Sequence, residues 1–186
     1  YGQRAAAAEI RAAQALCRYY DVRHAVVNLP WLGALGGNAL TNSKQELPRF
    51  GSLASDLDHV GRTAESAAAV WVPNRNGVLI EVAGAYAERE GASFVVVGFN
   101  REEAASFPDN SEEYLNRVSH ALALITRHHA RVRCFTVEWD KRQIVAHLKA
   151  GLSRPFPFEQ VWSCYEGCEK PCGTCESCRR FARARA

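Results

Sequence analysis

The chain has 186 residues, of which 47% are hydrophobic and 23% are charged, and this fits one compact domain with a small appendage. These proportions exclude a disordered chain, and no apolar run reaches the roughly 20 residues that cross a bilayer. No secretory signal opens the sequence, so we expect a cytoplasmic protein with no membrane partner. Because methionine is absent altogether, we also expect a segment to be missing upstream of Tyr1.

The net charge of +3 arises at the C-terminus, where the last eight residues hold four Arg and no acidic residue. The rest of the chain is nearly neutral, so we expect no direct contact with nucleic acid, which requires a basic patch across the fold. The basic tail fits either a solvated helix end, where cations favour the negative pole of the helix dipole, or a short surface for nucleic acid or a protein partner.

In the first part of the chain, the spacing of apolar residues predicts a helix over Arg4–Tyr19, closed by Asp21. The segment His24–Leu29 is short and β-branched in its middle, which predicts a buried strand ended by Pro30. From Pro30 to about Ser66, scattered Gly, Pro and polar residues predict a long loop. A loop of this length is either a lid over a binding site or a disordered insertion.

The chain then alternates between helices and strands. Asn74 suits an N-cap and Gly91 a C-cap for the first of these helices. The predicted elements are helix Arg75–Glu90, strand Ser93–Val97, helix Ser111–Thr126, strand Val132–Val137 and helix Lys141–Ala150. This alternation predicts an α/β fold with a doubly wound, mostly parallel sheet. Ligands bind such sheets beyond the carboxyl ends of the strands, which are followed by Pro30, Gly98–Asn110 and Glu138–Lys141.

Five of the seven cysteines fall between Cys164 and Cys178. The run Cys172-Gly-Thr-Cys175-Glu-Ser-Cys178 contains two overlapping C-x-x-C steps, and Cys164 or Cys168 would complete the tetrahedral shell that structural zinc prefers. An iron–sulfur cluster could use the same ligands, and redox-active thiols are a third interpretation. With four thiolates no coordination position stays open, so we expect a structural metal that ties down the C-terminal tail.

Six segments, in order over almost the whole chain, carry a resemblance to a known family. The most specific is Trp162-Ser-Cys-Tyr165 with Glu169-Lys-Pro-Cys-Gly-Thr-Cys-Glu-Ser-Cys178. The others are Tyr1-Gly-Gln-Arg4, Leu35-Gly-Gly-Asn-Ala-Leu-Thr41, Val72-Pro-Asn-Arg-Asn76, Val97-Gly-Phe-Asn100 and Phe107-Pro-Asp-Asn110. Together they resemble the 7-cyano-7-deazaguanine synthase family, called QueC.

The resemblance implies an adenine-nucleotide α-hydrolase-like fold of the ATP pyrophosphatase type, with an α/β domain over residues 1–160 and a zinc segment over residues 161–186. It implies an ATP-dependent C–N ligase of queuosine biosynthesis, in which ATP, with Mg²⁺, adenylates 7-carboxy-7-deazaguanine. Ammonia then displaces AMP, and a second activation dehydrates the amide to a nitrile. A homodimer is also implied. The alternatives are a relative acting on another carboxylate, or a non-catalytic zinc module binding nucleic acid or a protein.

The resemblance also implies roles for individual residues. One zinc per chain would bind Cys164, Cys172, Cys175 and Cys178, while Cys168 stands where the family more often has Gly. Contacts to ATP or substrate would come from Gln3, Arg4, Arg75, Asn76, Gly98 and Asn100. Lys141 would bind phosphates, and Asp109 would orient the substrate or accept a proton. From residue type alone, Arg75 is also compatible with a capping and surface-pairing role, Lys141 with an exposed lysine, and Asp109 with an N-cap or turn.

One departure from the family stands out. Its first strand normally ends in Ser-Gly-Gly-x-Asp-Ser, whose backbone amides cradle pyrophosphate, and this chain has no such motif. The pair Gly36-Gly37 belongs to a different family segment and does not replace it. Because Tyr1 matches the family just downstream of that strand, we expect truncation rather than a relative without ATP chemistry.

Overall fold

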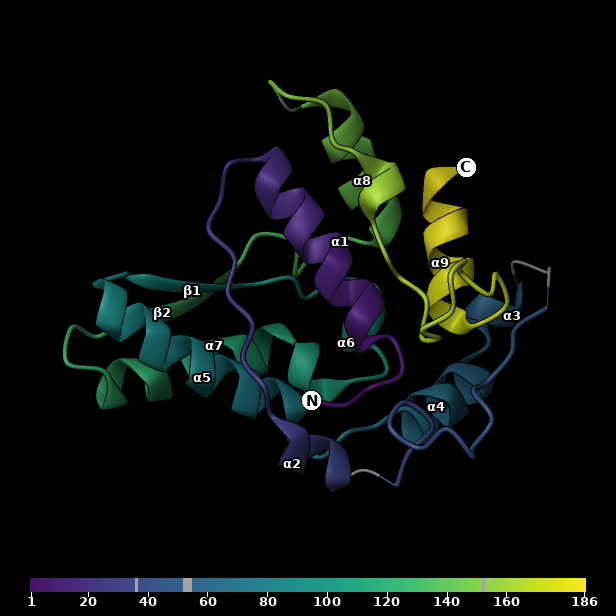
Figure 1. Cartoon of the computed structure of the whole chain (residues 1–186), viewed down its shortest axis with the longest axis horizontal. Helices are drawn as coiled ribbons and strands as arrows, with labels where there is room; N and C mark the ends of the chain where they lie inside the picture. The colour runs from purple at the N-terminus through teal and green to yellow at the C-terminus, as the bar shows by residue number, and fades with distance from the viewer. Residues whose placement is uncertain (36, 52–54, 152) are drawn as a thin grey trace. The chain divides into compact units, whose positions relative to one another are not determined.

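A computed structural model describes residues 1–35, 37–51, 55–151 and 153–186; Gly36 of the Gly36-Gly37 pair lies outside them. Its helices and strands are labelled in Figure 1. The chain forms two compact units, which we call the sheet unit (residues 74–144) and the cysteine unit (residues 1–73 with 145–186). The domain boundary expected at residue 160 stays a prediction. No helix in the described ranges is long and apolar enough to span a bilayer.

The sheet unit is built on two parallel strands, β1 (Phe94–Val97) and β2 (Arg131–Cys134), with Phe94 paired to Arg131. Among the described residues, these two strands form the whole sheet. The helices of the unit are α5 (Arg75–Glu90), α6 (Arg101–Ala104), the 3-10 helix Pro108–Asn110 and α7 (Glu112–Ile125). The last helix, α8 (Lys141–Ala150), begins in this unit and ends in the cysteine unit. Parallel strands joined through α7 confirm the expected α/β class.

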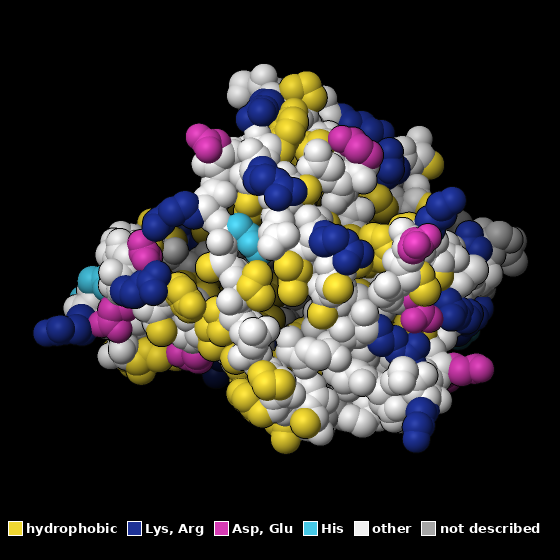
Figure 2. All heavy atoms as spheres, viewed as in Figure 1, with side chains coloured by type: hydrophobic (Ala, Val, Ile, Leu, Met, Phe, Trp, Pro, Cys, Tyr) yellow, Lys and Arg dark blue, Asp and Glu magenta, His cyan; other side chains and the backbone are white. Residues whose placement is uncertain are grey.

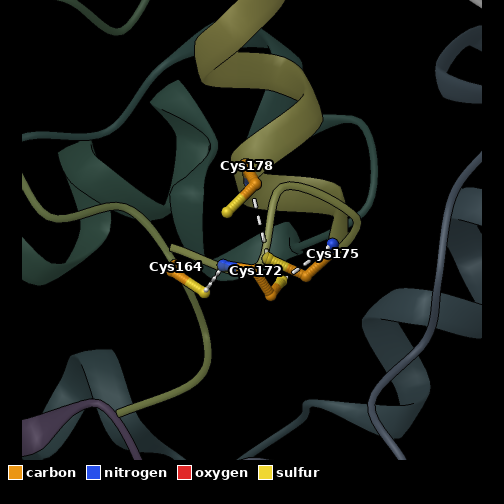
Figure 3. Close-up of side chains that lie close together, drawn as sticks. All are labelled: Cys164, Cys172, Cys175 and Cys178. Atoms are coloured by element: carbon orange, nitrogen blue, oxygen red, sulfur yellow. Dashed lines mark hydrogen bonds between the residues drawn. The ribbon is translucent and has the colours of Figure 1, made fainter. Parts of the chain in front are cut away.

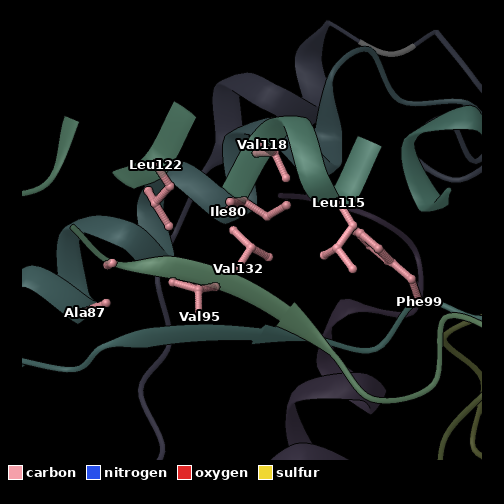
Figure 4. Close-up of a cluster of buried hydrophobic side chains, with 9 residues drawn as sticks. Ile80, Ala87, Val95, Phe99, Leu115, Val118, Leu122 and Val132 are labelled. Carbon is pink, nitrogen blue, oxygen red and sulfur yellow. The ribbon is translucent and has the colours of Figure 1, made fainter. Parts of the chain in front are cut away.

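The core of the sheet unit lies where α5 and α7 pack on the sheet (Figure 4). Val95 of β1 and Val132 of β2 are buried in it, whereas the residues that flank each of them in its strand are more exposed. Gly84 lets α5 approach α7, because a Cβ there would stand 2.4 Å from Leu122 Cδ1. This packing fixes both strands against a common core and leaves their carboxyl ends available to form a binding site.

Local sequence signals place two helix ends in this unit, the C-terminus of α5 and the N-terminus of α7. Helix α5 spans the predicted Arg75–Glu90, and Gly91 ends it with a φ of +66°. Ser111 caps α7, where its hydroxyl accepts the N–H of Tyr114 at 3.1 Å. Asn74 occupies the N-cap position of α5 but its side chain makes no capping bond, so the capping role predicted for it was wrong.

The cysteine unit corrects the long loop expected from residue 30 to about residue 66. Its helices are α1 (Ala6–Tyr19), α2 (Pro30–Ala34), α3 (Ser55–Asp58), α4 (Val60–Ala69), the 3-10 helix Phe158–Gln160 and α9 (Glu176–Arg185). Helix α4 begins where His59 Nδ1 accepts the N–H of Arg62 at 3.2 Å. Gly61 does not break it, because this glycine lies in the first turn and an Ala-rich stretch follows.

The strand expected at His24–Leu29 is also wrong. These residues carry no strand pairing in the described chain, and Val26 and Val27 are 46% and 40% exposed. β-Branched residues favour an extended backbone, but a strand also needs a hydrogen-bonded neighbour. The preceding helix ends as predicted, with Asp21 in the left-handed region at a φ of +56°.

Candidate functional site

Four cysteines meet in the cysteine unit (Figure 3). The sulfur atoms of Cys164, Cys172, Cys175 and Cys178 all lie within 4.8 Å of one another. The turn that brings them together passes through Gly173, whose φ of +72° favours glycine, and Cys175 then caps α9 by accepting the N–H of Cys178. Cys168 is exposed and lies outside this group.

The four thiols fit a tetrahedral metal site. A Zn–S bond of about 2.3 Å places tetrahedral sulfurs about 3.8 Å apart, within the spread observed here. Backbone N–H groups already point at the sulfurs: Glu166 and Cys172 donate to Cys164 Sγ, and Cys175 donates to Cys172 Sγ, each at 3.3 Å. These donors stabilise negative sulfur, so the cluster is prepared for thiolates.

The pKa values in the cluster differ because burial and hydrogen bonding oppose each other. Burial favours the neutral thiol of Cys172, but N–H groups of Thr174 and Cys175 outweigh it and lower the pKa to about 6. Burial raises the pKa of Cys175 to about 11 and that of Cys178 still further. A divalent metal overcomes the resistance of Cys175 and Cys178 to ionisation, because thiols lose their proton when they coordinate a metal.

Distant parts of the cysteine unit hold the cysteine segment in place. The Phe50 N–H donates to the Thr174 carbonyl at 2.7 Å, and Glu166 bridges Arg4 at 3.3 Å and Arg49 at 3.0 Å. Glu166, which the sequence analysis missed, is therefore the centre of an ion-pair network around the cluster.

Two residues expected to contact ATP or substrate, Gln3 and Arg4, lie in this unit and already have protein partners. The Gln3 side chain donates to Glu9 at 2.7 Å. Besides Glu166, the Arg4 guanidinium donates to the carbonyl oxygens of Asn42, at 2.7 Å, and Gln45. In this structure Arg4 therefore links the N-terminal segment to the loop before α3 and to the cysteine segment.

The arginines of the C-terminal tail have intramolecular partners. Arg180 pairs with Glu176 at 2.8 Å, with both side chains buried, and Arg183 pairs with Asp58 at 2.7 Å. Arg179 donates to the Phe50 carbonyl at 3.3 Å, and Arg185 lies over the ring of Phe181. On the face drawn in Figure 2, Lys and Arg are interspersed with Asp and Glu among the described residues. These contacts disfavour the alternative of a basic tail that binds nucleic acid.

A second cluster lies in the sheet unit, beyond the carboxyl ends of β1 and β2. Lys141 Nζ contacts Glu103 Oε1 at 2.8 Å, and the two side chains are 22% and 35% exposed. Asn100 Oδ1 accepts the Glu103 N–H at 3.1 Å and so caps α6. Burial works against ionisation of Glu103, but the Lys141 ammonium, Asn100 and the Arg75 charge hold its pKa below the usual range.

Asp109 shows the opposite behaviour in the same cluster. Burial raises its pKa, and the nearby charge of Arg75 and a side-chain hydrogen bond from Asn76 only partly oppose this. Asn76 also donates to the Asp109 carbonyl at 3.4 Å. Two carboxyl groups with opposite shifts beside two cations form an arrangement typical of catalytic sites.

The sheet unit contains six of the eight residues expected to contact ATP, substrate or the reacting groups: Arg75, Asn76, Gly98, Asn100, Asp109 and Lys141. Open space adjoins Gly98, where a Cβ would meet no heavy atom within 4 Å. Sequence reasoning missed Glu103. Its signal was a capping-box pattern, Asn100-Arg-Glu-Glu103, which begins three residues after the end of a strand.

The raised pKa of Asp109 predicts that Asp109→Asn stabilises the fold. The folded protein binds the carboxyl proton more tightly than the unfolded chain, so stability falls as pH rises from the unfolded pKa near 3.8 through the higher folded value. Asp109→Asn removes the cost of burying the ionised carboxylate, so its free energy of unfolding at pH 7 should be higher than that of the parent. The rise should stay below about 1 kcal/mol, because solvent screens a carboxyl group that is only half-buried. Urea unfolding at pH 4 and pH 7 measures it. A destabilised variant at pH 7 would instead give the carboxylate a structural role.

Comparison with known proteins places the whole chain in one family. The family described as "Queuosine biosynthesis protein QueC" matches residues 1–186. A protein named 7-cyano-7-deazaguanine synthase from Desulforudis audaxviator is 48% identical over 185 residues, which cover 100% of this chain and 81% of that protein. Proteins of the same name from Pelotomaculum thermopropionicum and Methanosarcina mazei are 47% and 42% identical, and the matches cover 99% of this chain and 81% and 79% of theirs. The chain therefore belongs to the QueC family.

Proposed function

We propose that this protein is a 7-cyano-7-deazaguanine synthase that uses ATP to convert 7-carboxy-7-deazaguanine and ammonia into 7-cyano-7-deazaguanine. The observation that carries the proposal is the match of almost the whole chain to relatives of that name at 42–48% identity. A doubly wound, mostly parallel sheet, to which β1 and β2 contribute, is part of the same proposal.

The reaction needs cations near the nucleotide. A carboxylate is a poor electrophile, and transfer of AMP to it turns one oxygen into a leaving group while pyrophosphate departs. Ammonia attacks the acyl carbon and displaces AMP, which gives an amide. Transfer of AMP from a second ATP to the amide oxygen releases pyrophosphate, and loss of the nitrogen-bound protons with departure of AMP, which carries away the oxygen, gives the nitrile. Negative charge develops on phosphate oxygens in each activation, so fixed cations lower the barrier.

Within this reaction, the cluster in the sheet unit supplies the charged groups. Arg75 and Lys141 contact the phosphates of ATP, which also brings Mg²⁺; Arg acts as a fork of donors and Lys as a point charge. Asp109 orients the deazaguanine or accepts a proton, a role that its raised pKa favours. Asn76, Gly98 and Asn100 line the approach to these groups, and Gln3 and Arg4 are proposed as further nucleotide contacts.

The four cysteines hold one structural Zn²⁺ in this proposal. Their sulfurs lie close enough to share a tetrahedral ion, and two of them are fully buried. Zinc supplies cross-linking and charge neutralisation, because a shell of four thiolates leaves no open position for substrate. Cys164, Cys172, Cys175 and Cys178 therefore act on stability rather than on the reacting atoms.

The proposed function predicts AMP formation that depends on one substrate. Protein made from the complete gene should convert ATP to AMP and pyrophosphate only when 7-carboxy-7-deazaguanine is present, because the acyl-adenylate needs an acceptor carboxylate. Chromatography of AMP and of the nitrile measures both products. AMP formation with a different carboxylic acid, and none with this one, would overturn the substrate assignment.

Removal of either proposed phosphate contact should slow the reaction. Arg75→Ala and Lys141→Ala should each lower kcat by about 100-fold or more, since a donor aimed at developing charge contributes roughly 3 to 4 kcal/mol. Arg117→Ala is the matched control, because this arginine pairs with Glu113 at 2.7 Å on the surface, where the two side chains are 79% and 74% exposed. The control should keep kcat within about twofold of the parent. Equal losses in all three variants would contradict the assignment.

The ligand assignment predicts different metal contents in cysteine variants. Cys172→Ser should lose bound zinc, whereas Cys168→Ser should keep one zinc per chain, because Cys168 is exposed and lies outside the sulfur cluster. Elemental analysis of the purified variants measures this. Zinc retained by Cys164→Ser and lost by Cys168→Ser would exchange these two residues in the ligand set.

A further inference from the structure

Two residues of the short helix α6 bind the backbone and the side chain of Lys141. The Lys141 backbone N–H donates to Glu102 Oε1 at 3.3 Å, and the Lys141 ammonium contacts Glu103 Oε1 at 2.8 Å. Lys141 is the first residue of α8 and has a long, flexible side chain, which α8 alone leaves free to rotate. Glu102 therefore holds the backbone of Lys141, and Glu103 holds its ammonium.

Glu103 is itself fixed by its neighbours. Its N–H is bound by Asn100, and its carbonyl accepts the N–H groups of Ser106 at 3.0 Å and Phe107 at 2.8 Å. Its pKa is held low, chiefly by Lys141 against the effect of burial, so the carboxylate stays charged at neutral pH. An anchored and ionised carboxylate is a suitable partner for orienting a cation.

We propose that Glu103 is a positioning residue that holds the Lys141 ammonium in place for phosphate oxygens. The proposal rests on the proposed function, in which Lys141 contacts ATP. An ammonium carries three N–H donors, so one bond to Glu103 leaves two for phosphate. Holding the group before ATP arrives removes the entropy cost of ordering it during the reaction, and a cation fixed in advance stabilises developing charge best.

The first test separates positioning from a general structural effect. Glu103→Gln keeps the size of the side chain but removes its charge, and Glu103→Asp keeps the charge on a shorter arm. In protein from the complete gene, Glu103→Gln should lower kcat by about 10-fold or more with little change in KM for ATP, since misplacement by about 1 Å costs up to about 100-fold. Glu103→Asp should recover part of this loss. Glu113→Gln, which breaks the exposed pair with Arg117, should leave kcat unchanged.

Non-additivity gives the sharper comparison. Glu103 acts only through Lys141 in this proposal, so adding Glu103→Gln to Lys141→Ala should cost nothing beyond Lys141→Ala alone. Losses that multiply in the double variant, or an increase confined to KM, would overturn the positioning role.

A second measurement does not depend on the reaction. An amine-reactive ester at neutral pH should label Lys141 severalfold faster in Glu103→Gln than in the parent, because the ammonium has lost its ion-pair partner. Lys149, at the other end of α8 with a hydrogen bond to the Arg185 carbonyl, is the internal control and should label equally in both proteins. Equal labelling of Lys141 overturns the proposal. In the same assay, added ATP should slow the labelling of Lys141 if this residue contacts phosphate. If ATP does not slow it, but Glu103→Gln still speeds it, the result counts against the proposed function alone.

Discussion

Four sulfur atoms within 4.8 Å of one another impose the strongest constraint on this protein. Thiolates at that spacing repel, and buried thiols resist ionisation, so the charged cluster is stable only around a cation. Neighbouring contacts hold the cysteine segment in position. Glu166 pairs with Arg4 and Arg49 beside the cysteines, and the Phe50 N–H donates to the turn between Cys172 and Cys175. The segment that follows residue 160 is thereby tied to the N-terminal part of the unit.

In the sheet unit, the parallel pairing of β1 and β2 is the main constraint on the position of the candidate site. Because β1 and β2 run in the same direction, the segments that leave their carboxyl ends meet at one edge of the sheet. One of these segments carries Glu103 and Asp109, and the other leads to Lys141, while Arg75 begins α5. Lys141 beside Glu103 holds the pKa of that carboxyl low, whereas burial raises the pKa of Asp109. Environment, not residue type, gives the two carboxyl groups different chemistry.

Predictions from sequence succeeded where the determining interactions are local. Gly91 ends α5 and Ser111 caps α7 because the bonds involved join residues only a few positions apart. The strand predicted at residues 24–29 failed because a strand depends on a distant partner, and this segment has strand composition without a paired neighbour. Two local signals also misled: Asn74 does not cap α5, and the glycine that suggested a loop lies in the first turn of α4.

The sequence by itself determined the family, the boundaries of α5 and α8, and the cysteine spacing that marks a metal site, because motifs, caps and C-x-x-C steps are short-range patterns. Only the tertiary structure decided that Glu103 pairs with Lys141, 38 residues further along the chain, and that the tail arginines are engaged inside the molecule. The sequence shows which side chains carry charge, but ion pairs depend on distances of a few ångströms that arise only when separate elements pack together.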